Sequence, residues 1–516
     1  MYKTKLFLNK LINILSGRYR REILSLLFTL PLFYLMYPIF VSDSVGYLSY
    51  LDYFDGIKNF SEWDNVRGIA YPLYLWLGEK IIGANATALN MTLYIPYFVM
   101  ICYVYKIADM FIEECHSRRD YFMKYGPCAI LFFHPYIYGY YHYVLTEALT
   151  LTVLIIAVFV ILRNYSNDGV NQSLISELGY YFEVAILCAI SYSIKQMYIV
   201  PPVVLFILCE IIKMIRKVSV RNIILFFIAV IICSVALLGY ICIFNSQTSN
   251  GYNVFNNISN VTQRYFDYNK YTQEITVYDD EYQQKDQYSV SDGAGYFKIK
   301  YEMFKKHPLR FIETFVDNYL CLANVYRMDG MFEGWGFNRG PLQKHHVFYN
   351  IIISTRYGYV QTAENYAFCI WELNQAGIEY EWNARFDSMY KNSSEAGYEA
   401  SARRMKPYRH EGNATVMRYV LANSVSRVLV CFTYTICTLI EFPVFILALI
   451  LCIKKKTIRD QIMYGMICAL SGSAFAHTMA MDITGCIIDR YIMPAHLEML
   501  LCIMIFFWGT NKKATR

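Results

Sequence analysis

The sequence is short of charge, and it lacks the cysteine spacing of a metal-binding domain. Charged residues make up 17% of the 516 positions, against 56% hydrophobic and 17% aromatic. Fifteen cysteines are scattered with no C-x-x-C pair, which argues against zinc and indicates small buried apolar residues. The net charge of +6 lies in short basic clusters beside apolar runs. That pattern predicts membrane orientation and no nucleic-acid partner.

Long apolar runs dominate what is present. Each is long enough to cross roughly 30 Å of hydrocarbon, which takes about 20 helical residues. We therefore predict a mainly α, polytopic membrane protein with about ten spans in contact with membrane lipids. The predicted spans are residues 23–41, 87–107, 125–141, 144–162, 178–193, 197–215, 223–244, 425–453, 462–481 and 491–508.

Charge asymmetry predicts the orientation of these spans. The arm 1–22 is basic and the first loop, 42–86, is acidic, so the positive-inside rule places both chain ends in the cytoplasm. No small-residue cleavage site follows the first span, which is expected to be a retained signal anchor. A composition rich in Tyr, Ile, Asn and Lys suggests an AT-rich bacterial genome, and the expected location is the bacterial cytoplasmic membrane. Two membrane modules, 23–244 with about seven spans and 425–516 with about three, then enclose a large extracytoplasmic insertion, 245–424.

The insertion contains one clear helical pattern. Apolar residues recur at helical spacing from Tyr296 to Tyr319, with a break at His307-Pro308. Two amphipathic helices on the membrane interface and a helical pair inside a soluble domain fit this pattern equally. A disulfide between Cys321 and Cys369 stays open, because the spacing does not indicate one.

Two carboxylates stand out on the predicted outer face. Asp43 directly follows the first span, and Glu147 opens the fourth. An ionisable group at a membrane edge costs free energy unless it is paired or used, so both are candidate catalytic residues. The alternatives are that Asp43 caps a short helix and that Glu147 complements a helix dipole.

Three cations share that face, namely Arg67, Lys195 and Arg490. Guanidinium and ammonium groups suit the binding of a phosphate, although each could instead pair with an acid or snorkel to the surface. His142 and His477 are further acid/base candidates, for which a structural role is the commoner outcome.

These residues resemble the GT-C membrane glycosyltransferases, which include protein O-mannosyltransferases and bacterial aminoarabinose transferases. The similarity is carried by Asp43, by Tyr71-Pro72 with Trp76-Leu77 before Gly83, by Glu147, by Lys195 in SIKQMYIVPP, and by Arg490-Tyr491-x-x-Pro494. It covers the membrane part from position 43 to about 203 and the last span. Ser44 stands where many members have a second acid, and Glu147 replaces the more usual Asp.

The resemblance implies a GT-C-like fold and an inverting transfer of a sugar from a polyprenyl-phosphate donor to an envelope glycan, lipid or protein. On it, Asp43 is the general base or orients the acceptor, and Glu147 positions the acceptor or assists Asp43. Arg67, Lys195 and Arg490 hold the donor phosphate. The aromatic residues nearby, with one histidine, are the expected substrate-binding group: Tyr47, Tyr71, Trp76 and His142. The lipid-linked sugar is a co-substrate. No metal site is predicted, and a dependence on a divalent metal stays open.

Two other functions remain open. A polysaccharide polymerase or ligase that uses undecaprenyl-pyrophosphate glycans would employ arginines and a histidine of the large outer loop, and Arg403, Arg404, Arg409 and His410 are present there. A transporter or flippase would predict two related halves, whereas the chain shows no internal repeat.

Overall fold

A computed structural model gives the fold of part of the chain. The described residues are 20–34, 38, 40, 42–63, 67–112, 118–166, 174–216, isolated positions between 224 and 239, 266–269, 274–277, 293–323, 328–329, 338–339, 391, 403–409, 436–455, 457–484 and 489–511.

Helices make up most of the described chain, which confirms the mainly α prediction. They are α2 (Arg20–Phe33), α3 (Ser42–Ser49), α4 (Leu51–Phe54), α5 (Ala70–Ile81), α6 (Ala86–Phe111), α7 (Arg118–Phe132), α8 (Pro135–Tyr140), α9 (Thr146–Ser166), α10 (Leu174–Ile194), α11 (Val200–Arg216), α13 (Gly293–Lys306), α14 (Pro308–Leu322), α21 (Thr438–Lys454), α22 (Ile458–Thr484) and α23 (Met493–Asn511). Short 3-10 turns cover Phe60–Glu62 (η1), Gln196–Ile199 (η2), Lys406–Tyr408 (η3) and Asp489–Ile492 (η5).

Two antiparallel hairpins complete the described elements. In the first, β1 (Phe266–Asn269) pairs with β2 (Glu274–Val277), so that Phe266 lies opposite Val277. In the second, β3 (Met328–Asp329) pairs with β4 (Asn338–Arg339). Both lie in the predicted insertion, where the sequence pattern indicated no strands.

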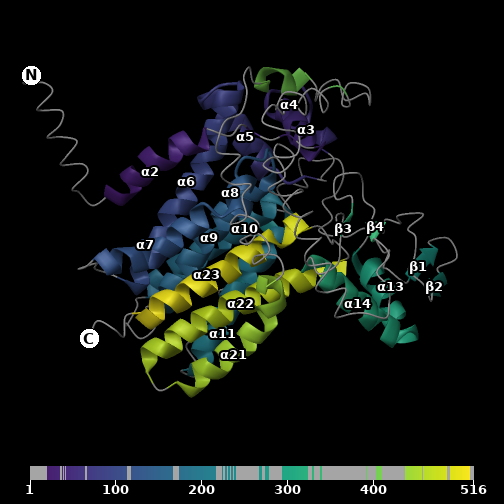
Figure 1. The fold of residues 1–516 in the computed structure, drawn as a ribbon. Coiled ribbons are helices and arrows are strands. Elements are labelled where there is room, and N and C mark those ends of the chain that lie inside the picture. Colours follow the sequence, from purple (N-terminus) through teal and green to yellow (C-terminus); the bar gives the residue numbers. More distant parts are fainter. Residues whose placement is uncertain are drawn as a thin grey trace, which may run out of the picture.

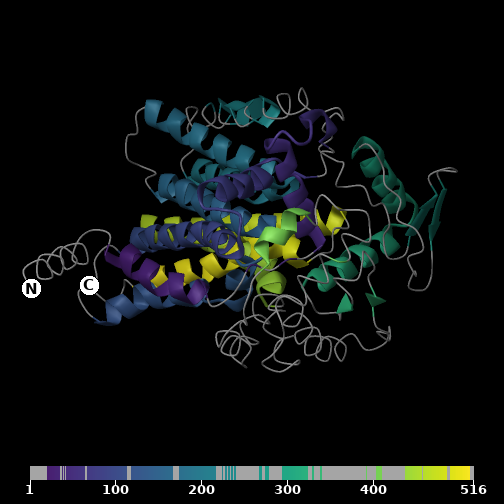
Figure 2. The same ribbon diagram turned by 90° about the horizontal axis from the view of Figure 1, so that it is seen from above.

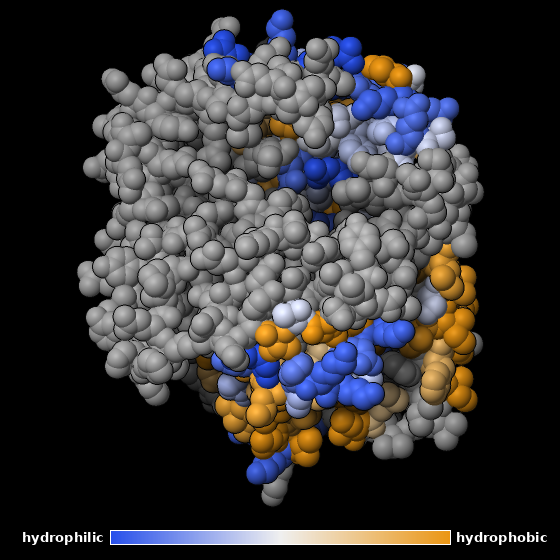
Figure 3. Space-filling view, turned by 90° about the vertical axis from the view of Figure 1, so that its right-hand side faces the viewer, coloured by the Kyte–Doolittle hydropathy of each residue, from blue (hydrophilic) through white to orange (hydrophobic). Residues whose placement is uncertain are grey.

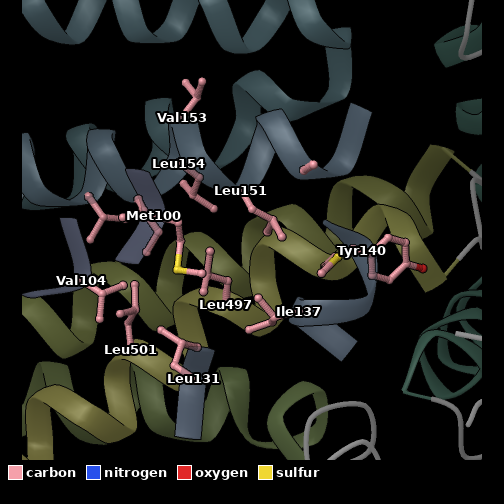
Figure 4. Packing of buried hydrophobic residues seen from close by; sticks show 14 of the residues in the cluster. Met100, Val104, Leu131, Ile137, Tyr140, Leu151, Val153, Leu154, Leu497 and Leu501 are labelled. Atoms are coloured by element: carbon pink, nitrogen blue, oxygen red, sulfur yellow. The ribbon is translucent and has the colours of Figure 1, made fainter. Parts of the chain in front are cut away.

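The core of the bundle is formed by apolar faces of α6, α9 and α23. Met100 of α6, Leu154 of α9 and Leu497 of α23 point toward one another, and Leu131 of α7 and Ile137 of α8 close the same cluster (Figure 4). Because these side chains come from distant parts of the sequence, their burial fixes how the helices are arranged.

Five of the described helices are long and apolar enough to cross a membrane. They span Ala86–Phe111, Thr146–Ser166, Gln196–Ile215, Ile458–Ile483 and Met493–Thr510, and each matches a predicted span. The chain is therefore an integral membrane protein. Helices α2, α7 and α21 have only 14, 15 and 17 residues. The predicted span 223–244 lies mostly outside the described residues.

Two predicted spans have different bounds in the structure. The first was expected to continue to Val41, but α2 ends at Phe33 and Pro38 lies outside any helix. The third, 125–141, is interrupted after Phe132, and α8 starts at Pro135, whose fixed φ suits a first helical turn. Apolar periodicity alone does not reveal such breaks.

The bundle has two distinct ends. At one, α2 begins and α23 finishes near each other (Figures 1 and 2). There the Arg21 and Lys124 side chains both pair with Asp109, at 2.6 and 2.7 Å, and Trp508 donates to the Lys124 carbonyl. Helices α3, α4, α5, α13 and α14 lie toward the opposite end, which we call the site end.

Candidate active site

Asp43 forms an ion pair with Arg67 at the site end. Asp43 lies in the first turn of α3, and its Oδ1 is 3.3 Å from Arg67 Nη2. One turn later, Gly46 leaves room for the guanidinium, since a Cβ at that position would overlap it. The buried Trp63 donates from Nε1 to the Arg67 carbonyl at 3.0 Å. Helix and loop therefore fix this arginine together.

The Arg67 guanidinium also lies over an aromatic ring. Its Cζ is 4.3 Å from the centre of the Tyr47 ring, and Tyr47 packs edge-to-face on Tyr71 with ring centres 5.0 Å apart. Burial lowers the pKa of Arg67, but Tyr47 and Asp43 outweigh it and the net pKa is raised. The side chain is a permanent cation on an aromatic floor. We call Asp43, Tyr47, Arg67 and Tyr71 the Asp43 cluster.

Glu147 is buried in the first turn of α9, as the sequence predicted. Its Oε1 accepts a hydrogen bond from the Tyr198 hydroxyl at 3.1 Å, and its Oε2 accepts one from Thr146 at 3.3 Å. The start of a helix also favours a negative charge. Tyr198, which the sequence reasoning missed, thus sets the direction of this carboxylate from η2.

Lys195 lies between α10 and α11 and directs its cation at an aromatic ring. Its Nζ is 3.8 Å from the centre of the Tyr491 ring and 6.0 Å from that of Tyr198. The segment carrying Tyr491 is held in turn by His477, whose Nε2 donates to the Tyr491 carbonyl at 2.7 Å. Lys195 and Tyr491 of the Arg-Tyr-x-x-Pro motif, both named from the sequence, are therefore in contact.

One close approach brings the Arg67 loop against the segment that leads to Lys195. Gly68 approaches the Ser193 carbonyl so closely that a Cβ would overlap it, which brings the Arg67 loop against the end of α10. Tyr71 is fully buried, and its hydroxyl has no hydrogen-bond partner among the described residues. Burial, and then the charges of Tyr47 and Glu147, raise the pKa of Tyr71 well above its usual value.

Three predicted site residues are placed differently or not described. Both ring nitrogens of His142 lie near main-chain carbonyls, of Tyr138 at 3.0 Å and of Phe33 at 3.1 Å, so His142 anchors the end of α2. Burial lowers its pKa to about 4. Trp76 donates to Asp55 instead of joining the Asp43 cluster. The side chain of Arg490 lies outside the described part.

A second ionic group lies close by on α4 and α5. Arg404 pairs with Asp52 at 2.6 Å, with Glu79 at 3.2 Å and with Asp55. Tyr408 donates to Glu79 at 2.8 Å. We call these five residues the Arg404 network. It attaches the segment 403–409 of the predicted insertion to the first loop.

The local charges keep Asp55 ionised. Burial raises the pKa of Asp55, but Arg404, Lys80 and Trp76 outweigh it and hold the pKa well below its usual range. Within the described residues, no group of three or more His, Cys, Asp or Glu side chains is arranged to hold a metal ion.

Comparison with known proteins gives a limited result. No protein-family model matches the chain, and no curated protein matches it. The crystal structure of ArnT from Cupriavidus metallidurans bound to undecaprenyl phosphate is similar at 7% sequence identity, over 96% of this chain and 79% of that chain, with a TM-score of 0.35. A likeness of this size carries no argument about the site.

Proposed function

We propose that this protein is a membrane glycosyltransferase that moves a sugar from a polyprenyl-phosphate donor to an acceptor hydroxyl. The observation that carries the proposal is that the Arg67 loop, which holds the ion pair with Asp43, packs against Ser193, two residues before Lys195, while Tyr198 of the same connection holds Glu147. Asp43 pairs with Arg67, while Glu147 and Lys195 are held through Tyr198 and Tyr491. A cluster of this composition suits a phosphate leaving group and a hydroxyl that must lose a proton.

The cations are assigned to the donor. Arg67 offers a planar set of N–H donors that can bind two phosphate oxygens at once, and Lys195 adds a second positive charge. Arg490 is proposed for the same role from its sequence position. Together they stabilise the negative charge that develops on the phosphate as its bond to the sugar breaks.

The carboxylates are assigned to the acceptor. Asp43 accepts the proton of the acceptor hydroxyl while the hydroxyl oxygen attacks the anomeric carbon and polyprenyl phosphate leaves. Because Asp43 is paired with Arg67, a phosphate at that arginine lies beside the base. Glu147 orients the acceptor, and the buried Tyr71 hydroxyl donates to a substrate oxygen.

The test is sugar transfer from defined donors by purified protein. Asp43→Asn removes the base and is expected to lower turnover by about 100-fold or more, at the level expected for general base catalysis. Wild type and variant are each assayed with labelled polyprenyl-phosphate sugars as donors and envelope extract as the source of acceptors. Asp460→Asn is the matched control. Asp460 lies at the start of α22, and its hydrogen bond to Thr457 uses the main-chain N–H, which the substitution leaves in place.

Unchanged turnover in Asp43→Asn, with a normal elution profile, would remove Asp43 from the mechanism. Transfer only from pyrophosphate-linked glycans would instead favour the polymerase or ligase function. One observation already weighs against that alternative. Arg404, one of the arginines on which it depends, is occupied by three carboxylates of the first loop.

A further inference from the structure

Helices α13 and α14 expose an apolar stripe. On α14, Leu309 is 82% exposed, Ile312 50% and Val316 47%. Their spacing of three and four residues puts all three on one face of the helix. Tyr301 and Phe304 extend the exposed stripe onto α13. Apolar and polar residues lie side by side on this side of the molecule (Figure 3).

The opposite face of the same helices is packed. Met303 and Thr314, on that face, are fully buried. Tyr319, seven residues after Ile312 and therefore on the stripe side of α14, donates its hydroxyl to the carbonyl of Thr438, the first residue of α21. The exposed apolar face turned away from Met303 and Thr314 needs an environment of its own, because large exposed apolar patches mark interaction surfaces.

Next to the stripe lies α21, the described part of the predicted span 425–453, which exposes apolar side chains. Helix α21 begins at the residue that Tyr319 contacts, and it exposes Phe442, Leu447 and Ile450. Its sequence, TLIEFPVFILALILCIK, is apolar throughout its central part. The exposed stripe of α14 thus lies at the end of an apolar surface suited to hydrocarbon.

Charged residues flank the stripe in the manner of an interfacial helix. Lys305 and Lys306 are exposed in the last turn of α13, directly before the exposed Leu309. Arg310 is balanced by Glu313 at 2.5 Å, so the two lysines carry the free positive charge at the junction. Lysine at the edge of an apolar face binds lipid phosphates while its stem remains in the apolar layer.

We propose that α13 and α14 form a membrane-interface hairpin, with Leu309, Ile312 and Val316 in the acyl-headgroup boundary and Lys305 and Lys306 on lipid phosphates. The hairpin anchors the start of the predicted insertion to the bilayer, at the end of the bundle that carries the candidate active site. This assignment does not depend on the proposed function. It assigns the helix pair to the membrane interface and not to the interior of a soluble domain, the two environments that the sequence pattern left open.

Site-specific photocrosslinking tests the hairpin. A photoreactive phenylalanine replaces Leu309, Ile312 or Val316 in full-length protein reconstituted in vesicles of phosphatidylethanolamine and radiolabelled phosphatidylglycerol. The matched control is Asn59, an exposed polar position between α4 and η1. We expect lipid adducts at all three stripe positions, at least fivefold above the control, and a lower yield at each when Lys305 and Lys306 are both changed to Gln.

Other outcomes would overturn the proposal. Adducts the size of two chains would identify a second copy as the occupant. Lipid labelling no higher than at position 59 would show that the stripe faces water or another part of the chain. Because the three positions are exposed, the variants are expected to fold, and elution in detergent checks this. The expected labelling holds even for a variant without transferase activity.

Discussion

At the scale of single residues, the position of Arg67 depends on the absence of a side chain at Gly46. We expect Gly46→Ala to push the guanidinium away from Asp43, because the new methyl group would occupy its place. Transferase turnover should fall by about tenfold to a hundredfold, the cost of misplacing a catalytic group by about 1 Å. Steady-state kinetics with the polyprenyl-phosphate donor measures this.

The stability of that variant separates displacement from unfolding. Alanine favours a helix over glycine by roughly 0.5–1 kcal/mol, so α3 itself should not weaken. Gly179→Ala in α10 is the matched control, because open space surrounds that position. Normal activity in Gly46→Ala would mean that the Asp43 to Arg67 contact is not needed for transfer.

The sequence predicted the charged members of the site but not what orients them. Asp43 and Glu147 could be found because an acid beside an apolar run is conspicuous. Tyr198 could not, because it is one of 49 tyrosines and its bond to Glu147 joins residues 51 positions apart. His142 was named from the sequence, but its partners were not, because its carbonyl contacts depend on where α2 ends.

At the scale of elements, the segment 403–409 is held by charge. Asp52 is completely buried, and the side chains of Asp55 and Glu79 are 16% and 11% exposed. Removing Arg404 leaves three carboxylates without their main partner, a change that typically costs about 3–5 kcal/mol. We expect Arg404→Gln to lower the free energy of unfolding by that amount at pH 7, as measured by thermal unfolding in detergent.

Acid should diminish the effect of that substitution. The pKa of Asp55 is lower in the folded chain than in the unfolded one, so its stabilisation is complete above about pH 4 and declines as the pH falls further. Wild type and Arg404→Gln should therefore converge in stability below that pH. Arg403→Gln, at a side chain 66% exposed and 3.7 Å from Asp52, should cost less than about 1 kcal/mol. Equal losses in both variants would contradict the assignment.

Element boundaries were predicted where a strong breaker lies between two patterns. The break at His307-Pro308 separates α13 from α14 as expected. The break before Pro135 was missed because apolar residues continue on both sides of it. The Arg404 network was missed for a different reason: the acids of α4 needed a counter-charge, but no local pattern identifies a partner about 350 residues away.

At the scale of the whole molecule, the orientation in the membrane is a prediction from charge. We expect a cysteine at Asn59 to be labelled by an impermeant maleimide added outside intact cells, and one at Thr457 to be labelled only after lysis. Both positions are exposed; Asn59 follows α4 at the site end, and Thr457 lies in the connection between α21 and α22. The described cysteines are buried or half-buried, which keeps their background labelling low. The reverse pattern would place the candidate active site in the cytoplasm.

The sequence predicts composition-driven features of the whole molecule better than its packing. Helical content and five spans follow from apolar runs long enough to bury their backbone groups in lipid. The total of ten spans remains a prediction. The contact that brings Lys195 to Tyr491 depends on how distant helices pack, and apolar periodicity does not encode that choice.

The Arg404 network also orders events during synthesis. Asp52 and Arg404 are 352 residues apart, so at typical elongation rates roughly 20–70 s pass between the making of the acids and the making of their partner. During that interval Lys80 can already pair with Asp55, but the completely buried Asp52 is paired with arginines of the segment 403–409, so Asp52 must stay hydrated until that segment is made. A nascent chain thus acquires its finished first loop only after most of the insertion has been made.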